Sequence, residues 1–213
     1  MASNYDCSSV VEIDEEPRHH LVIANEFVRA FAVEIAPHDR TLCHHHPHDY
    51  LLYVASDAEI ISAARDEEPK RLSYRDGECE LSPAGLVHVV ENLGDEPFRN
   101  VVVELLPAAS SLRHDDNPKL MQGDGQVTQE FGDERAAIFV SKMSRGAGMK
   151  ICGPAVIASC YGHQLGLAVP RREEHEINSF TDLCWLGAGE LGIAANLEAV
   201  DAKVVIFQVG TGR

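Results

Sequence analysis

The stretch Gly77–Asn92, GECELSPAGLVHVVEN, carries the strongest fold signature in this chain. Pro83 fixes the backbone φ angle and Gly85 permits a left-handed one, so these two residues predict a tight turn between two strands. His88 follows the turn by three residues, on a predicted strand. Because side chains alternate along a strand, His88 and Asn92 are expected on the same face of it.

A burst of histidines lies upstream, in the sequence CHHHPHD of residues 43–49. His44 and His46 are two residues apart, so on a strand both imidazoles point to one face while His45 points to the other. If that face lines a barrel, the pair converges on His88 from an antiparallel neighbour. Three neutral imidazoles suit Zn, Fe, Ni or Cu and leave coordination positions open to water or substrate.

Two other interpretations of the histidine burst stay open. The burst can be a His-rich surface loop that collects adventitious metal. The pair can also be His46 and His48, although Pro47 between them fits a strand poorly. The remaining histidines have no convergent partner in the sequence and are interpreted as surface or packed core residues: His19, His20, His38, His114, His163 and His175.

The downstream stretch resembles the second motif of the cupin superfamily, G-x5-P-x-G-x2-H-x3-N. Every specified position of that motif is matched, from Gly77 through Pro83, Gly85 and His88 to Asn92. The resemblance implies an all-β fold built from cupin double-stranded β-helix (jelly-roll) barrels, with His88 as a metal ligand.

The first cupin motif, G-x5-H-x-H-x3,4-E-x6-G, is matched only in part. His44 and His46 stand in the right register, which implies that both are metal ligands. His38 and Asp57 occupy the two glycine positions, and the second change is mild because Asp tolerates left-handed turn geometry. Tyr50 replaces the glutamate that is the family's usual fourth ligand. Tyr50 is expected to line the site, most simply as a packed tyrosine with a bonded hydroxyl, and whether it binds the metal stays open.

The second half of the chain looks like a repeat of the first, shifted by 104 residues without gaps. Gly85 falls on Gly189 and Asn92 on Asn196, but His88 falls on Gly192. The same shift places Gly148 and Lys150 opposite the first histidine pair. The chain therefore resembles a bicupin with two barrels in tandem. We predict an N-terminal barrel over residues 1–112, a polar linker over 113–134 and a degenerate C-terminal barrel over 135–213, in which 135–143 is either a strand or a short helix.

Composition restricts the function classes. The chain has 213 residues, 45% of them hydrophobic, and a formal net charge of −16, which argues against nucleic acid and anionic membranes as partners. It has no apolar run long enough to span a membrane and no secretory signal, so a cytoplasmic location is expected. Six cysteines without a C-x-x-C pattern are then expected to be reduced, with Cys43 on the strand face opposite the histidine pair.

The resulting functional expectation is a metal-binding cupin that acts on a small molecule as an oxygenase, isomerase or lyase. Its cofactor is expected to be Fe, Zn, Ni, Mn or Cu, held by His44, His46 and His88. Three-His cupins, among them thiol and diketone dioxygenases, retain metal without the glutamate. A non-catalytic ligand-binding or sensing module and a structural or storage role are the alternatives. The resemblance also implies a homodimer.

Overall fold

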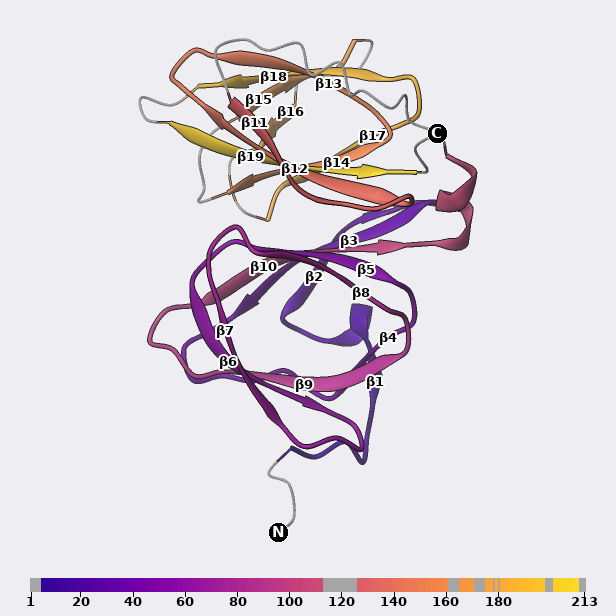
Figure 1. Ribbon diagram of the computed structural model, residues 1–213, viewed down its shortest axis with the longest axis vertical. Coiled ribbons are helices and arrows are strands. Elements are labelled where there is room, and N and C mark those ends of the chain that lie inside the picture. The colour runs from indigo at the N-terminus through magenta and orange to yellow at the C-terminus, as the bar shows by residue number, and fades with distance from the viewer. Residues whose placement is uncertain are drawn as a thin grey trace. The chain divides into compact units, whose positions relative to one another are not determined.

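The computed structural model describes residues 5–112, 126–160, 165–170, 175–177, 179, 181–197 and 201–210. These residues form strands joined by turns, with two short 3-10 helices, η1 (Ile13–Glu15) and η2 (Pro107–Ser111). The all-β expectation is confirmed, and Figure 1 labels the strands in chain order. None of the described residues forms a helix long and apolar enough to cross a membrane.

The chain divides into two compact units. The first comprises Met1–Leu21 and Phe31–Leu105, and the second comprises Val22–Ala30 and Leu106–Arg213. The domain boundaries proposed at residues 112 and 135 stay a prediction. Residues 113–125 of the proposed linker lie outside the described residues, and Gln126–Gly132 forms strand β11.

Two five-stranded sheets make the first barrel, in the orders β1-β4-β9-β6-β7 and β2-β3-β10-β5-β8. Apolar residues two apart on β3 and β5 point into the space between the sheets and form its core. The strands are β1 (Val11–Glu12), β2 (His19–Ala24), β3 (Val28–Ile35), β4 (His44–His46), β5 (Tyr50–Val54), β6 (Ala58–Ala64), β7 (Lys70–Tyr74), β8 (Cys79–Ser82), β9 (Leu86–Asn92) and β10 (Phe98–Leu105).

The predicted turn at Pro83–Gly85 fastens β9 to the end of β4. Gly85 has a φ of +92°, which a residue without Cβ adopts at no steric cost. Its N–H donates to the His46 carbonyl at 2.8 Å, and the Ala84 N–H donates to Asp49 Oδ1 at 2.7 Å. These bonds fix the antiparallel register of the two strands, in which His44 lies opposite His88.

Asn92 shapes the loops at the other end of β9. Its side-chain Nδ2 donates to the carbonyls of Ile35 at 3.1 Å and Glu96 at 2.8 Å, and its Oδ1 accepts the Gly94 N–H at 2.9 Å. Asn92 is thus a buried loop anchor. His38 stands at the first glycine position of the upstream motif. It has a φ of +57°, so the backbone there is left-handed although the residue is not glycine.

The described strands of the second barrel repeat the strand order of the first, except that β1 has no counterpart among them. Adding 104 to the bounds of β8 and β10 gives the bounds of β17 and β19. Its sheets have the orders β11-β12-β19-β14-β17 and β13-β18-β15-β16. The strands are β11 (Gln126–Gly132), β12 (Ala136–Met143), β13 (Gly148–Cys152), β14 (Ala155–Cys160), β15 (Leu165–Ala168), β16 (His175–Ile177), β17 (Leu183–Leu186), β18 (Leu191–Asn196) and β19 (Ala202–Val209).

Apolar side chains fill the interior of the second barrel. A Cβ on Gly192 would lie 2.9 Å from Leu186 Cδ1 and 3.2 Å from Leu167 Cδ1, so leucines occupy the place that His88 takes in the first barrel. The expected correspondence of Gly148 and Lys150 with the histidine pair is wrong, because Ile151 lies opposite Gly192 as His44 lies opposite His88, three residues beyond the expected position. Met149 and Ile151 are the buried members of β13, because a shift by an odd number of residues along a strand exchanges its two faces.

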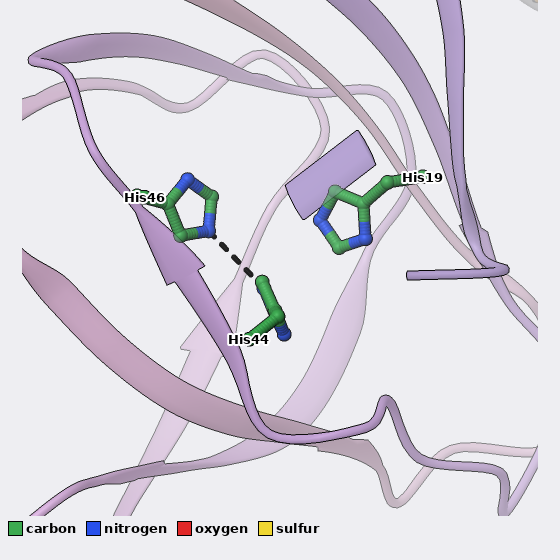
Figure 2. Close-up of side chains that lie close together, drawn as sticks. All are labelled: His19, His44 and His46. Atoms are coloured by element: carbon green, nitrogen blue, oxygen red, sulfur yellow. Dashed lines mark hydrogen bonds between the residues drawn. The ribbon is translucent and has the colours of Figure 1, made fainter. Parts of the chain in front are cut away.

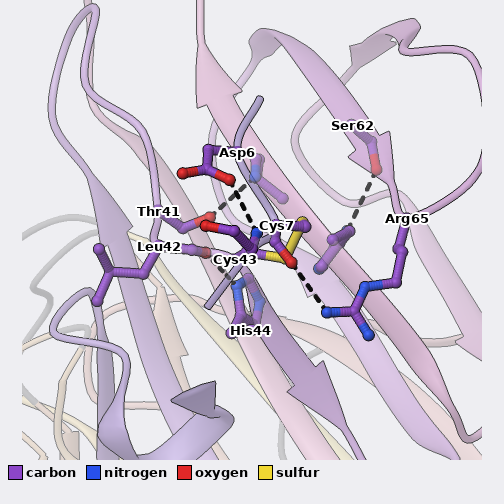
Figure 3. The surroundings of a disulfide bond; sticks show 11 residues. Asp6, Cys7, Thr41, Leu42, Cys43, His44, Ser62 and Arg65 are labelled. Atoms are coloured by element: carbon purple, nitrogen blue, oxygen red, sulfur yellow. Dashed lines mark hydrogen bonds between the residues drawn. A yellow bond between two sulfur atoms is a disulfide. The ribbon is translucent and has the colours of Figure 1, made fainter. Parts of the chain in front are cut away.

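One disulfide contradicts the expectation that all six cysteines are reduced. Cys7 and Cys43 are joined across 36 residues of sequence, on the side of β4 away from His44 (Figure 3). Cys43 lies on the opposite face, as predicted. Its partner Cys7 belongs to an N-terminal segment, and the spacing of residues in the sequence does not show where that segment lies. Cys79, Cys152 and Cys184 are not joined in disulfides. A reducing compartment stays a prediction, and the disulfide counts against it.

Candidate metal centre

Four buried histidines meet inside the first barrel. His44 and His46 come from β4 and His88 from β9, the neighbouring strand of the same sheet. His19 comes from β2 in the facing sheet, and its ring centroid lies 4.6 Å from that of His44. All four side chains are less than a tenth exposed. The cluster therefore joins the two sheets across the barrel interior.

Two pairs of ring nitrogens have the spacing of two ligands on one ion. Nε2 of His46 lies 3.1 Å from Nε2 of His44 (Figure 2) and 3.3 Å from Nε2 of His88. With metal–nitrogen bonds of about 2.0–2.1 Å, two nitrogens on a tetrahedral ion are roughly 3.3–3.4 Å apart. Lone pairs at this separation repel each other unless a proton or a cation lies between them. The spacing thus fits a bound metal.

The outer nitrogens of two rings are held by neighbours. His44 Nδ1–H donates to the Leu42 carbonyl at 2.9 Å, which leaves the Nε2 lone pair facing the cluster. His88 Nδ1 lies 3.2 Å from Ser62 Oγ, a hydroxyl that can accept the Nδ1 proton and so leave the Nε2 lone pair facing the cluster. Such bonds from the outer nitrogen fix the tautomer of metal-binding histidines. Among the described residues, buried His46 Nδ1 has no hydrogen-bond partner.

Burial keeps three of the histidines neutral. Burial, together with the nearby His19, lowers the pKa of His44 to about 4. Burial also lowers the pKa of His46 and of His88 well below the ordinary range, and neighbouring imidazoles add to the effect. A neutral imidazole is the form that binds a metal, so no proton has to leave these rings near neutral pH.

His19 is the site residue that the sequence interpretation missed. One ring nitrogen from each of His19, His44 and His46 can be chosen so that all three lie within 4.8 Å of one another. His19 Nδ1–H donates to Glu16 Oε2 at 2.8 Å, so its Nε2 is the free nitrogen. The one sequence feature that could have indicated His19 is Glu16, a carboxylate three residues before it.

Glu16 holds two of the histidines. Its buried carboxylate accepts His19 Nδ1–H and also the Leu42 N–H at 3.2 Å, and the Leu42 carbonyl in turn orients His44. Burial raises the pKa of Glu16, but the bonds from His19, the Arg18 N–H and the Leu42 N–H outweigh it and set the pKa at about 2. Glu16 therefore places a permanent negative charge beside the cluster.

Tyr50 supports the cluster without offering an anion. Its ring stacks on His46 with centroids 4.3 Å apart, and its hydroxyl is hydrogen-bonded to Ser82. Burial raises the pKa of Tyr50 to about 12, so the hydroxyl stays protonated at neutral pH. Tyr50 is packed as expected, with a bonded hydroxyl, and whether it binds a metal stays a prediction.

The structure brings together the three histidines that the sequence singled out, and their role as metal ligands stays a prediction. Strand β4 ends at His46, so Pro47 and half-buried His48 lie beyond it and the alternative pair is not formed. His45 points away from the cluster, with Nδ1 3.3 Å from Glu12 Oε1. Of the remaining histidines, His20 and His38 are exposed, His114 and His163 lie outside the described residues, and the His175 side chain is not described.

The cluster opens onto a cavity of about 250 Å³ within the barrel. His19, His46 and His88 line it on the metal side. Most of the wall is apolar, and the other polar residues that line it are Tyr50, Ser62, Tyr74, Glu80, Ser82 and Asn100. A small organic molecule thus has room next to the candidate metal.

No protein-family model matches the sequence, and no curated protein matches it. Solved structures do match the fold. AerE from Microcystis aeruginosa is 14% identical with a TM-score of 0.59, and the match covers 91% of this chain and 98% of AerE. A cupin 2 conserved barrel domain protein from Leptotrichia buccalis is 11% identical with a TM-score of 0.53, covering 90% of this chain and 88% of that protein.

The oxalate decarboxylase of Lactobacillus farciminis, solved as a formate complex, is 10% identical with a TM-score of 0.62. That match covers 88% of this chain and 78% of the decarboxylase. Identities this low show the fold alone. They confirm that the chain has the cupin fold, with two jelly-roll barrels in sequence.

Proposed function

We propose that the first cupin barrel binds one divalent transition metal through His44, His46 and His88, with His19 as a fourth imidazole. The observation that carries this proposal is the convergence of Nε2 atoms at 3.1 and 3.3 Å within a buried cluster. Neutral rings, outer nitrogens held by Leu42, Ser62 and Glu16, and an adjoining cavity support it.

The donor set favours particular metals. Imidazole suits Zn, Cu, Fe and Ni, whereas carboxylate and water ligands suit Mn. Because Tyr50 stands where a carboxylate would bind, Mn is the least fitting of the expected metals. Glu16 offsets part of the ion's charge through His19 without touching the metal.

We further propose that the chain uses this site on a small organic molecule, as an oxygenase, isomerase or lyase. A metal bound here supplies Lewis-acid chemistry or dioxygen activation. The chain's own residues hold the molecule in the cavity, exclude water with an apolar wall, and keep a protonated phenol, Tyr50, beside it. The fold hosts many reactions and does not choose among them.

Metal analysis of protein purified without a His-tag tests the proposal. We expect about one metal ion per chain, and no stoichiometric metal in His46→Ala, which removes the nitrogen nearest to both neighbours. His45→Ala is the matched control, because that side chain lies on the same strand but faces away, and it should keep its metal. Equal metal content in wild type and His46→Ala would exclude this site.

A non-catalytic binding or sensing module is the second candidate, and the replacement of the acidic ligand by Tyr50 favours it. The two candidates differ in turnover. A metabolite that co-purifies with the metal-loaded protein and is released unchanged supports the binding module, whereas conversion of it supports the enzyme. The homodimer that the family resemblance implies is tested by light scattering of the chain in solution.

A further inference from the structure

A line of polar contacts runs along the cavity wall away from the histidine cluster. Tyr50 stacks on His46 and is hydrogen-bonded to Ser82, and Ser82 Oγ donates to Glu80 Oε1 at 3.2 Å. The Tyr74 hydroxyl is in turn hydrogen-bonded to Glu80. Glu80 is therefore linked to the candidate metal side through two intervening side chains.

The strand register explains why Glu80 points inward. Glu80 and Ser82 lie two residues apart on β8, opposite Leu52 and Tyr50 of β5. All four line the same cavity, whereas Cys79 and Leu81 do not. Among the described residues that line the cavity, none is lysine or arginine, so no such side chain on the wall neutralises the charge of the Glu80 carboxylate.

The rest of the cavity wall is lined by aromatic and aliphatic side chains, which suits an apolar ligand. Phe98 stacks on Tyr74 with centroids 6.0 Å apart and an interplanar angle of 6°. Branched aliphatic side chains complete the wall. The cavity of about 250 Å³ lies just below the usual range of ligand pockets, about 300–1,000 Å³, which fits a small one-ring molecule.

We propose that Glu80, supported by Tyr74 and Ser82, is a second recognition point that binds a protonated amine on a small apolar molecule whose other end faces the histidine cluster. The negative carboxylate in a mostly apolar cavity attracts an ammonium group and repels a carboxylate at the same place. Burial raises the pKa of the Tyr74 hydroxyl, and the nearby Glu80 carboxylate raises it further, so Tyr74 stays a donor that fixes the carboxylate in place.

The first experiment does not depend on the metal. Benzylamine, benzyl alcohol and benzoate share one ring and differ in the head group, and their binding to metal-free protein is measured by calorimetry. We expect benzylamine to bind at least tenfold more tightly than benzoate, with benzyl alcohol between them. Glu80→Gln should lower benzylamine affinity at least tenfold and remove the preference over benzoate. Glu67→Gln, an exposed glutamate in a turn, is the control that should leave both affinities unchanged.

Three results would overturn the assignment: benzoate binding as tightly as benzylamine, an unchanged preference in Glu80→Gln, or no binding of any of the three at millimolar concentration. A second experiment tests the two-ended arrangement, which rests on the proposed metal site. In protein loaded with Zn²⁺, 4-(aminomethyl)benzoate should bind at least tenfold more tightly than benzylamine or benzoate, because one molecule then engages both ends. In metal-free protein this gain should vanish.

The outcomes separate the two proposals. If Zn²⁺ does not bind, the metal site is wrong, and the order of the three probes in metal-free protein still decides the role of Glu80. If Zn²⁺ binds but 4-(aminomethyl)benzoate gains nothing, the metal site stands and the two-ended arrangement is overturned.

Discussion

The Glu16→Gln substitution tests how the candidate metal centre is held together. The Glu16 carboxylate accepts the Arg18 N–H at 2.7 Å, His19 Nδ1–H at 2.8 Å and the Leu42 N–H at 3.2 Å. A glutamine must turn its amide N–H₂ toward some of these donors, whichever way it is oriented. A bond to a charged group contributes about 1.5–3 kcal/mol, and a buried donor left without an acceptor costs about 1–3 kcal/mol. We expect the free energy of unfolding to fall by about 3 kcal/mol.

The same substitution should weaken metal binding. His19 loses the acceptor that fixes its tautomer, and Leu42 shifts relative to His44. Loss of such a supporting bond typically lowers metal affinity about 10–100-fold. The assays are urea denaturation of the metal-free protein and competition titration with a Zn²⁺ chelator.

Glu12→Gln is the matched control. Glu12 lies four residues away and its Oε1 is 3.3 Å from His45 Nδ1, but its side chain is 54% exposed. Exposed pairs of this kind contribute about 1 kcal/mol or less, so both measurements should stay near wild type. The reasoning is refuted if Glu16→Gln unfolds within about 0.5 kcal/mol of wild type and binds Zn²⁺ within about twofold of it.

Three further predictions concern stability. Cys7→Ser removes the cross-link to Cys43, and the chain-entropy relation for 36 residues gives a loss of about 4 kcal/mol in the free energy of unfolding, measured by urea denaturation. Wild type with reductant should lose as much. An unchanged urea midpoint would contradict the cross-link. Leu167→Ala in the filled second barrel should cost about 3 kcal/mol, more than Leu52→Ala beside the existing cavity, whereas the reverse order would contradict the difference between the barrels. The folded-state pKa of His44 lies at about 4 against 6.5 ordinarily, so the unfolded chain binds more protons between these values and stability rises with pH across that window. Metal-free protein should therefore lose about 2 kcal/mol between pH 7 and pH 5, and a flat profile would count against a buried, neutral His44.

The sequence predicted the parts of the fold that local geometry determines. The turn at Pro83–Gly85 depends on backbone angles that only a few residue types favour, so its residues reveal it directly. His44 and His46 share a face because strands have a period of two, and the antiparallel neighbour His88 follows from the same turn. These features need no knowledge of how the two sheets pack.

His19 could not be predicted in the same way. It lies 25 residues before His44 in a strand of the facing sheet, so only the packing of one sheet on the other brings the two rings together. The disulfide partner of Cys43 was hidden for a similar reason. In the second barrel a constant shift of 104 gives the bounds of β17 and β19, but the pairing of β13 with β18 is displaced by three residues, and an alignment without gaps then assigns the two faces of β13 the wrong way round.

The two barrels separate the residues that shape the fold from those that serve the site. Gly85 and Gly189 both have positive φ angles, and Asn196 donates to the Met143 carbonyl at 2.8 Å as Asn92 donates to that of Ile35. These residues act on backbone groups at the ends of strands, so they are needed whether or not a barrel binds anything.

The side chains that point into the two barrels can differ, because each has only to fill the interior or to line a cavity in it. In the second barrel, leucine and methionine side chains occupy the interior and gain hydrophobic stabilisation. In the first, buried imidazoles and a carboxylate occupy the corresponding interior and give up part of that gain. A barrel that keeps such polar groups inside, with each of His19, His44 and His88 held by its own hydrogen bond, gives up stability that a bound metal would restore. That asymmetry is the strongest physical argument for a functional site in the first barrel.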